Sequence, residues 1–292
     1  MKQTIQNEHL KISILDKGAE LCEIKSKIND LEYIWHAEPS VWGSSAPVLF
    51  PAIGAVKEGV VYYKGQPFHL PRHGFIRNNE KMQLIEKTET KVTYCLKQDK
   101  ATLEVYPFAF EFYISFILDG NSLQVHHRII NPDEEPLYFS LGGHPAFTCP
   151  FYENEKYEDY YLEFDEIETD VTWLLDEKGL VRPQTRPVLN QTSVLPLSHE
   201  LFRTDALIFK NLKSKGVSLK SRRNATCVRM DFTDFPYLGI WAKPEGDFVC
   251  IEPWLGIADS TEADQQLENK EGMVQLEGGS TYQAAYTITI IE

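Results

Sequence analysis

The feature that most constrains the fold of this chain is an alternation of apolar and polar residues with a period of two. Every second residue in 112–118 is Phe, Ile or Leu, and 123–129 repeats the pattern after the turn Asp119-Gly120-Asn121. Side chains of a strand point alternately to opposite faces of a sheet, so the two segments predict a hairpin with one buried face. The same alternation at 22–25, 92–96 and 282–290 predicts further strands.

Helical patterns are few. The segment from Asp259 to Glu262 reads as a capping box and predicts a short helix through about Leu267. No long amphipathic helix separates the predicted strands, which argues against parallel βαβ winding. Aromatic residues make up 12% of the chain, with 16 Phe and 14 Tyr, and they favour strands. We therefore predict an all-β fold, a large and mostly antiparallel β-sandwich with few short helices.

No stretch of the chain reads as a linker between domains. Residues 152–165 are acidic and aromatic, residues 190–199 are polar, and we interpret both as loops between strands. The short apolar segments 207–209 and 217–219 flank a Lys/Gly turn, and a turn at Asn29-Asp30 precedes 32–35. Large β folds often reach this length as one unit, so we expect a single domain over residues 1–292.

The charge balance limits the partners of the protein. Lys and Arg number 29 against 43 Asp and Glu, a net charge of −14, which argues against nucleic acid and anionic membranes as partners. The first ten residues lack the apolar core of a signal peptide, and no stretch approaches the roughly 20 apolar residues of a membrane span. Five widely spaced cysteines without a CxxC pair are typical of free thiols, so we expect a cytoplasmic protein.

The central segment 142–147, GGHPAF, is the first candidate for chemistry. It follows an apolar run, 137–141, that suits a buried strand. Two glycines let the backbone bend or approach another group closely, and Pro145 holds His144 in an extended conformation. The pattern therefore predicts a rigidly presented imidazole, a group that can donate a proton near neutral pH. The alternative is a turn histidine bonded to the backbone.

Glu252 is the strongest single candidate for function. It lies between an apolar strand, 248–251, and Pro253-Trp254. A carboxylate at the end of a buried strand is costly unless it is solvated, paired or used in a reaction. The alternative is a buried structural salt bridge.

The segment 69–78, HLPRHGFIRN, contains two histidines four residues apart. On a helix His69 and His73 would bind a metal, but Pro71 argues against a helix. An extended chain would separate the two histidines by about 13 Å. We therefore predict no metal site, and instead a turn that displays His73 and Arg77. The alternative for His73 is a loop histidine in water.

A further carboxylate, Asp205, precedes the apolar segment 207–209. It can accept hydrogen bonds from sugar hydroxyls, or it is a plain surface or capping residue. The GxSxG, P-loop, Rossmann and HExxH patterns are absent. The residues alone therefore indicate either general acid–base chemistry or the binding of a polar ligand in a β scaffold.

Four segments taken together resemble the aldose 1-epimerase (mutarotase) family, in particular its LacX-like branch. They are FPAIG, HGFIRN, GGHPAF and CIEPWLGIAD, and they occur in that order through nearly the whole chain. The resemblance implies one galactose mutarotase-like β-sandwich over residues 1–292. It also implies an enzyme that interconverts the α and β anomers of a free hexose, such as galactose or glucose, without a cofactor or metal.

The resemblance assigns a role to each candidate residue. Glu252 matches the base that removes the proton of the anomeric hydroxyl, and His144 matches the acid that protonates the ring oxygen. His73, Arg77 and Asp205 match residues that bind the sugar.

One departure from the family pattern leaves other functions open. Many relatives carry Arg directly after FPxxG, where this chain has Ala55, and Lys57 follows soon after. A sugar-phosphate epimerase would need a cationic cluster, for which Arg77, Lys57 and Arg72 are the candidates. A cytoplasmic sugar-binding protein without catalysis is a further alternative, whereas a glycoside hydrolase would need a second paired carboxylate. The sugar and the oligomeric state stay open.

Overall fold

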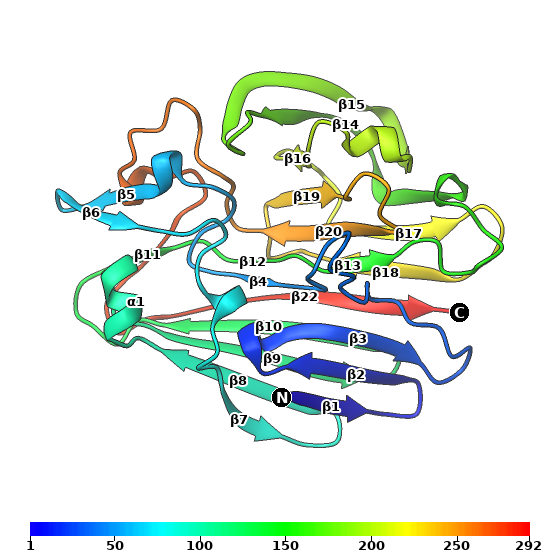
Figure 1. Cartoon of the computed structure of the whole chain (residues 1–292), viewed down its shortest axis with the longest axis horizontal. Helices are drawn as coiled ribbons and strands as arrows, with labels where there is room; N and C mark the ends of the chain where they lie inside the picture. The colour runs from blue at the N-terminus through cyan, green and yellow to red at the C-terminus, as the bar shows by residue number, and fades with distance from the viewer.

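The computed structural model describes all 292 residues, and antiparallel β-strands make up about half of it (Figure 1). The prediction of an all-β, antiparallel fold is confirmed. The largest sheet has nine strands in the order β15-β14-β17-β18-β22-β10-β9-β8-β7. Its strands are β7 (Gln83–Lys87), β8 (Lys91–Lys97), β9 (Glu111–Asp119), β10 (Ser122–Ile130), β14 (Tyr160–Leu175), β15 (Val181–Pro196), β17 (Gly216–Ser221), β18 (Cys227–Asp231) and β22 (Thr281–Ile291).

A second sheet carries the candidate functional residues. It has the order β16-β19-β20-β12-β4, and β13 also pairs with β20. Its strands are β4 (Val48–Leu49), β12 (Gly142–Gly143), β13 (Ala146–Thr148), β16 (Leu207–Phe209), β19 (Tyr237–Trp241) and β20 (Phe248–Trp254). All seven residues of β20 are buried, so this strand lies at the centre of the sheet and is covered on both faces.

Three small sheets and a few short helices complete the fold. The remaining strands are β1 (Lys2–Gln6), β2 (Leu10–Leu15), β3 (Glu20–Ser26), β5 (Val60–Tyr63), β6 (Gln66–His69), β11 (Leu137–Phe139) and β21 (Val274–Leu276). The helices are α1 (Lys100–Val105) and the 3-10 turns η1 (Lys17–Ala19), η2 (Lys57–Gly59), η3 (Ile76–Asn78), η4 (Tyr157–Asp159), η5 (His199–Phe202) and η6 (Leu267–Asn269). No helix has the length and apolar character needed to cross a bilayer.

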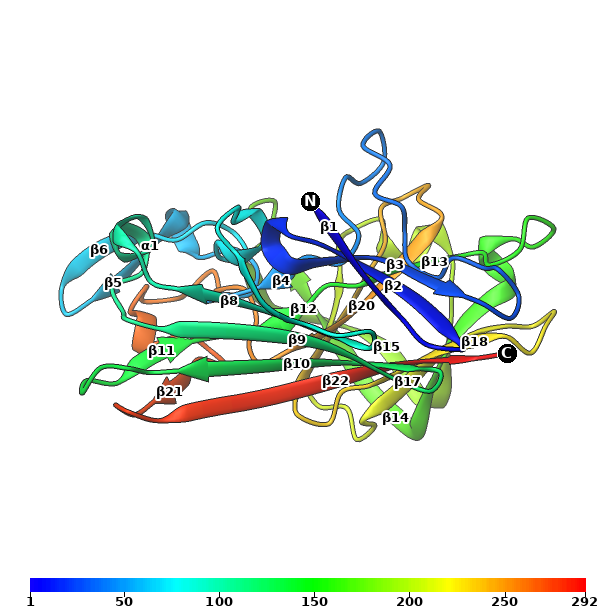
Figure 2. The same ribbon diagram turned by 90° about the horizontal axis from the view of Figure 1, so that it is seen from below.

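The sheets enclose a shared hydrophobic core. The predicted hairpin is β9–β10, with Leu118 opposite Leu123 and Phe112 opposite Ile129. Burial alternates along β9, so its apolar face joins a cluster of 66 buried residues that also includes residues of β1–β3 and β20. In Figure 2, β1–β3 lie over one face of the large sheet near β8–β10. Burying each large apolar side chain contributes about 1.5–3 kcal/mol, so this core holds the layers together.

The two segments that we interpreted as loops, 152–165 and 190–199, were assigned wrongly. Each contains part of the long hairpin β14–β15. The sequence did not indicate this hairpin, because β15 is an edge strand whose residues are mostly exposed. The strand therefore lacks an apolar face. Bulges bend the hairpin between Glu163 and Glu168. Its far half then reaches β16, where the Ile208 backbone N–H donates to the Thr172 hydroxyl at 2.8 Å.

The predicted helix from Asp259 to about Leu267 is also wrong. Only the 3-10 turn η6 forms, at the end of that segment. The Asp259 carboxylate does not cap a helix, because it accepts from the Lys57 backbone N–H at 2.9 Å and pairs with Lys270. The one α-helix, α1, was not predicted, although Asp99 and Thr102 form a capping box at its start.

Two predicted strand segments have partners that the sequence did not indicate. Residues 207–209 and 217–219 follow one another, but β16 belongs to the smaller sheet and β17 to the larger. The Lys/Gly turn therefore crosses between layers. Residues 32–35 form only isolated bridges, one of them between Ile34 and Phe147.

Candidate functional site

All five predicted site residues line one cavity of about 620 Å³. The cavity opens over the smaller sheet, and its wall includes Leu175 at the end of β14 and Gly179 in the turn before β15. The predicted residues on its surface are His73, Arg77, His144, Asp205 and Glu252. They come from four separate regions of the sequence, and the topology of the smaller sheet brings these regions together.

Two glycines allow His144 to lie beside β20. A Cβ atom on Gly142 would stand 2.6 Å from Cδ1 of Trp254, and one on Gly143 would stand 2.7 Å from the hydroxyl of Tyr286. No other residue fits such close contacts, so the predicted close approach of the backbone is confirmed. The carbonyl of Pro145 then accepts from the Ile251 N–H at 3.2 Å, which fixes the chain directly after His144.

Glu252 is buried in the middle of β20, and its exposed fraction is 1%. Burial raises the pKa of its carboxyl well above the usual 4.5 and nearby Asp205 raises it further, whereas Arg72 and Arg77 oppose the shift. A carboxylate with a raised pKa is a stronger proton acceptor. The structure therefore gives Glu252 the electrostatic setting of a general base.

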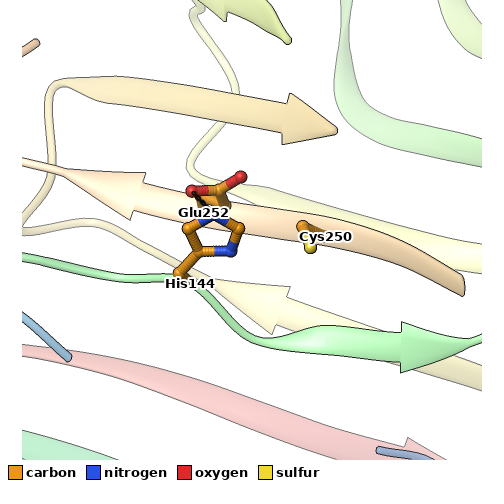
Figure 3. A group of neighbouring side chains, drawn as sticks. All are labelled: His144, Cys250 and Glu252. Atoms are coloured by element: carbon orange, nitrogen blue, oxygen red, sulfur yellow. Dashed lines mark ion pairs between the residues drawn. The ribbon is translucent and has the colours of Figure 1, made fainter. Parts of the chain in front are cut away.

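His144 and Glu252 face each other at the wall of the cavity, as Figure 3 shows. Nε2 of His144 lies 3.2 Å from Oε2 of Glu252, yet that oxygen and Nδ1 of His144 have no hydrogen-bond partner. Burial lowers the pKa of His144 to about 3 and raises that of Glu252. Both shifts disfavour charge, so burial favours the state with a protonated Glu252 and a neutral His144.

Aromatic side chains fix the ring of His144. Trp42 stacks on it with ring centroids 5.0 Å apart and an interplanar angle of 26°, and Trp241 meets it edge-on at 5.9 Å. Both tryptophans line the cavity, as does Trp254, whose buried indole N–H has no hydrogen-bond partner. Sequence reasoning missed all three, since Trp42 lies in a segment without regular structure and the other two lie within strands.

His73 presents its second nitrogen to the cavity. Its Nδ1 accepts from the Gly54 backbone N–H at 3.1 Å, so in the neutral ring the proton is on Nε2. Burial lowers the pKa of His73 well below 6.5, which keeps the ring neutral. His73 and Gly74 both have positive φ, and the Gly74 N–H closes the predicted turn on the Pro71 carbonyl. His73 is thus a fixed neutral hydrogen-bond donor.

The possible metal ligands differ from the histidine pair considered in the sequence. His69 is exposed at the end of β6 and does not line the cavity. The ligand atoms of His144, Cys250 and Glu252 instead lie within 4.8 Å of one another (Figure 3). Burial raises the pKa of the Cys250 thiol well above 9, which favours the protonated form that does not coordinate a metal. The donor set therefore fits a metal ion poorly.

Four cationic side chains line the cavity: Arg72, Arg77, Arg203 and Lys243. Arg72 and Arg77 were candidates from the sequence, whereas Arg203 and Lys243 were not, because they lie on loops more than 100 residues further along the chain. Lys57 does not replace the arginine missing at position 55, because its Nζ donates to the Ala263 carbonyl at 3.0 Å, away from the cavity.

A buried ion pair supports the loop behind the cavity. Lys270 Nζ lies 2.8 Å from the Asp259 carboxylate and donates to the Ile257 carbonyl at 2.6 Å. A Cβ atom on Gly54 would stand 2.5 Å from Cβ of Ala258, so the two cavity-lining backbones meet there. The end of the segment CIEPWLGIAD therefore holds the site together rather than contributing chemistry.

Comparison with known proteins finds similar sequences and structures over nearly the whole chain. Residues 1–272 match the family model of aldose 1-epimerase. The chain is 36% identical to the protein LacX of Lactococcus lactis subsp. lactis, over 98% of each sequence. The solved structure of a galactose mutarotase related enzyme from Lactobacillus acidophilus has a TM-score of 0.94 and 38% identity, covering 100% of this chain and 98% of that one. A galactose mutarotase-like protein from Lactobacillus casei has a TM-score of 0.93 and 26% identity, covering 100% of both chains.

Proposed function

This chain belongs to the aldose 1-epimerase family, and on that premise we propose that it is a mutarotase that interconverts the α and β anomers of an aldose. The single observation that carries the proposal is the contact of 3.2 Å between His144 and Glu252 on the wall of the cavity. The anomeric hydroxyl and the ring oxygen are bonded to one carbon. An acid and a base that act on both must therefore lie close together.

The reaction begins with the proton of the pair on His144 and with Glu252 ionised, a form in which the two charges attract each other across 3.2 Å and offset part of the cost of their burial. Glu252 takes the proton of the anomeric hydroxyl while the bond between C1 and the ring oxygen breaks, and His144 gives its proton to that oxygen. The open-chain aldehyde then rotates about the bond to C1, so the same hydroxyl can attack either face. Closure returns one proton to His144 and the other to the new anomeric hydroxyl.

The burial of the pair supports this cycle. After ring opening Glu252 is protonated and His144 is neutral, which is the state that burial favours. The uncharged pair thus stabilises the open-chain step without a compensating ion. In this proposal the N–H of His73 binds near the ring oxygen, and Arg77 and Asp205 bind sugar hydroxyls.

Polarimetry on freshly dissolved α-D-glucose and α-D-galactose tests the proposal. We expect the optical rotation to reach equilibrium faster in proportion to protein concentration for at least one of these sugars or a derivative of it. Equilibrium dialysis with the same sugars separates catalysis from binding. Sugar that binds without any change in the rate of interconversion would identify a carbohydrate-binding protein and overturn the proposal.

A further inference from the structure

The cavity differs in charge from the rest of the chain. The whole protein carries a net charge of −14, yet Arg72, Arg77, Arg203 and Lys243 line the cavity against two carboxyl groups. Of these two, Glu252 shares its proton with His144 in the mechanism proposed above, which leaves Asp205 as the other acid. A neutral sugar needs no such excess of cations.

Arg72 and Arg77 have no anionic partner in direct contact, although the charges of Glu20 and Glu252 act on Arg77 from further away. Arg203 pairs with Glu200, but neither Arg72 nor Arg77 forms an ion pair or a side-chain hydrogen bond within the chain. Arg72 is exposed at the rim, but Arg77 is half-buried, and an unpaired guanidinium that has lost part of its hydration is costly. A ligand that brings a negative charge would remove that cost.

Arg72 also stands next to the position where the family arginine is missing. It lines both the main cavity and a small adjoining one, and Ala55 lines the latter. Its guanidinium lies against Gly179, where an added Cβ would be 3.1 Å from Nη1. The short side chain at 55 and the glycine at 179 leave room for Arg72 at the rim of the cavity.

We propose that the substrate is an aldose with an anionic substituent, a phosphate or a carboxylate, whose charge is bound by Arg72 and Arg77. A guanidinium presents paired N–H donors that match the oxygens of either group. Lys243 adds to the positive field at the mouth, which attracts such a substrate, whereas Glu200 balances the charge of Arg203. Asp205 repels the anion and is left to accept from hydroxyls at another edge of the ring. This inference names the substrate class of the mutarotase and rests on that proposed function.

Exchange NMR at anomeric equilibrium tests the inference, because it needs no pure anomer. The probes are D-glucose, D-galactose, their 6-phosphates and the two hexuronates. We expect kcat/KM for an anionic aldose to exceed that for its neutral parent by at least about tenfold, since a hydrogen bond to a charged group is worth about a decade in affinity or more. Comparison of the 6-phosphates with the hexuronates shows whether a phosphate or a carboxylate is preferred.

Arg72→Gln should remove most of this preference, and Arg182→Gln, an exposed arginine outside the cavity, should leave it unchanged. The preference should also shrink in high salt, and Lys243→Gln should weaken it, so the test does not depend on one variant. Equal or better exchange of the neutral hexose, or a preference unaffected by Arg72→Gln, would overturn the inference alone. No exchange with any probe would instead overturn the proposed function.

Discussion

Two buried histidines, His144 at the cavity and His127 in the core, resemble each other in burial, in pKa and in their unpartnered ring nitrogens. Burial lowers the pKa of both to about 3, and both have ring nitrogens without a hydrogen-bond partner of good geometry. Their surroundings differ, because His127 packs among aromatic rings such as Phe112 and Tyr286, whereas His144 faces Glu252 across 3.2 Å. Burial and a lowered pKa therefore do not identify a site on their own.

The difference lies in access and in a partner for the proton. His144 lines the cavity, and His127 lines none of the three main ones. The two regions adjoin, since Tyr286 contacts the ring of His127 and its hydroxyl occupies the space beside Gly143. A core histidine and a catalytic candidate thus lie on either side of one tyrosine, and substitutions can separate their roles.

His144→Asn should cause the larger loss among the histidine variants. It removes the proton donor but keeps a polar group at the cavity wall, so turnover should fall by about 10²–10⁴ with less effect on sugar affinity. Turnover and a separately measured dissociation constant are both needed, since the Michaelis constant need not equal the latter. A variant that loses affinity but keeps its turnover would assign His144 to binding.

His73→Asn should reduce both affinity and turnover, because its fixed N–H is proposed to hold the ring near the reacting pair. We expect a smaller fall in turnover than for His144→Asn, measured with the same sugar and the same two assays. If this variant proved the more damaging to turnover, the roles of the two histidines would have to be exchanged.

His127→Leu should leave the exchange rate unchanged and alter the dependence of stability on pH. A folded pKa near 3 against an ordinary 6.5 means that the unfolded chain takes up a proton first as the pH falls. Stability conferred by the neutral ring is complete above about pH 6.5 and falls by about 1.4 kcal/mol per pH unit below it. Urea unfolding between pH 7 and pH 5 should show a shallower decline in the variant. An unchanged decline would show that His127 is accessible to protons in the folded state.

Chelators should have no effect on turnover. The cluster of His144, Cys250 and Glu252 contains a thiol that burial keeps protonated, and the proposed acid–base exchange uses the other two residues directly. Polarimetry in EDTA, followed by addition of Zn²⁺ or Mn²⁺, checks this point. Activity lost in EDTA and restored by either ion would place a metal among these side chains.

The sequence predicted the parts of this molecule that periodicity and local chemistry determine. Alternation identified β9–β10 and β22, and backbone chemistry around the glycines identified the turn of His73 and the presentation of His144. The hairpin β14–β15 was not predicted, because the exposed edge strand β15 has no apolar face. Arg203 and Lys243 were not predicted as cavity residues, because no sequence pattern indicates that loop residues far apart in the chain lie close together in the fold. The contact of His144 with Glu252 likewise depends on the pairing of β12 with β20.

The central claim is that His144 and Glu252 exchange protons with the sugar, and Glu252→Gln tests it most directly. The amide keeps the shape of the side chain but cannot take the proton. Polarimetric turnover should fall by about 10²–10⁴, with circular dichroism unchanged. Glu168→Gln is the matched control, because Glu168 is equally buried but accepts from Ser214 outside the cavity. Its turnover should stay at the wild-type level. A folded Glu252→Gln variant with near wild-type turnover would contradict the account.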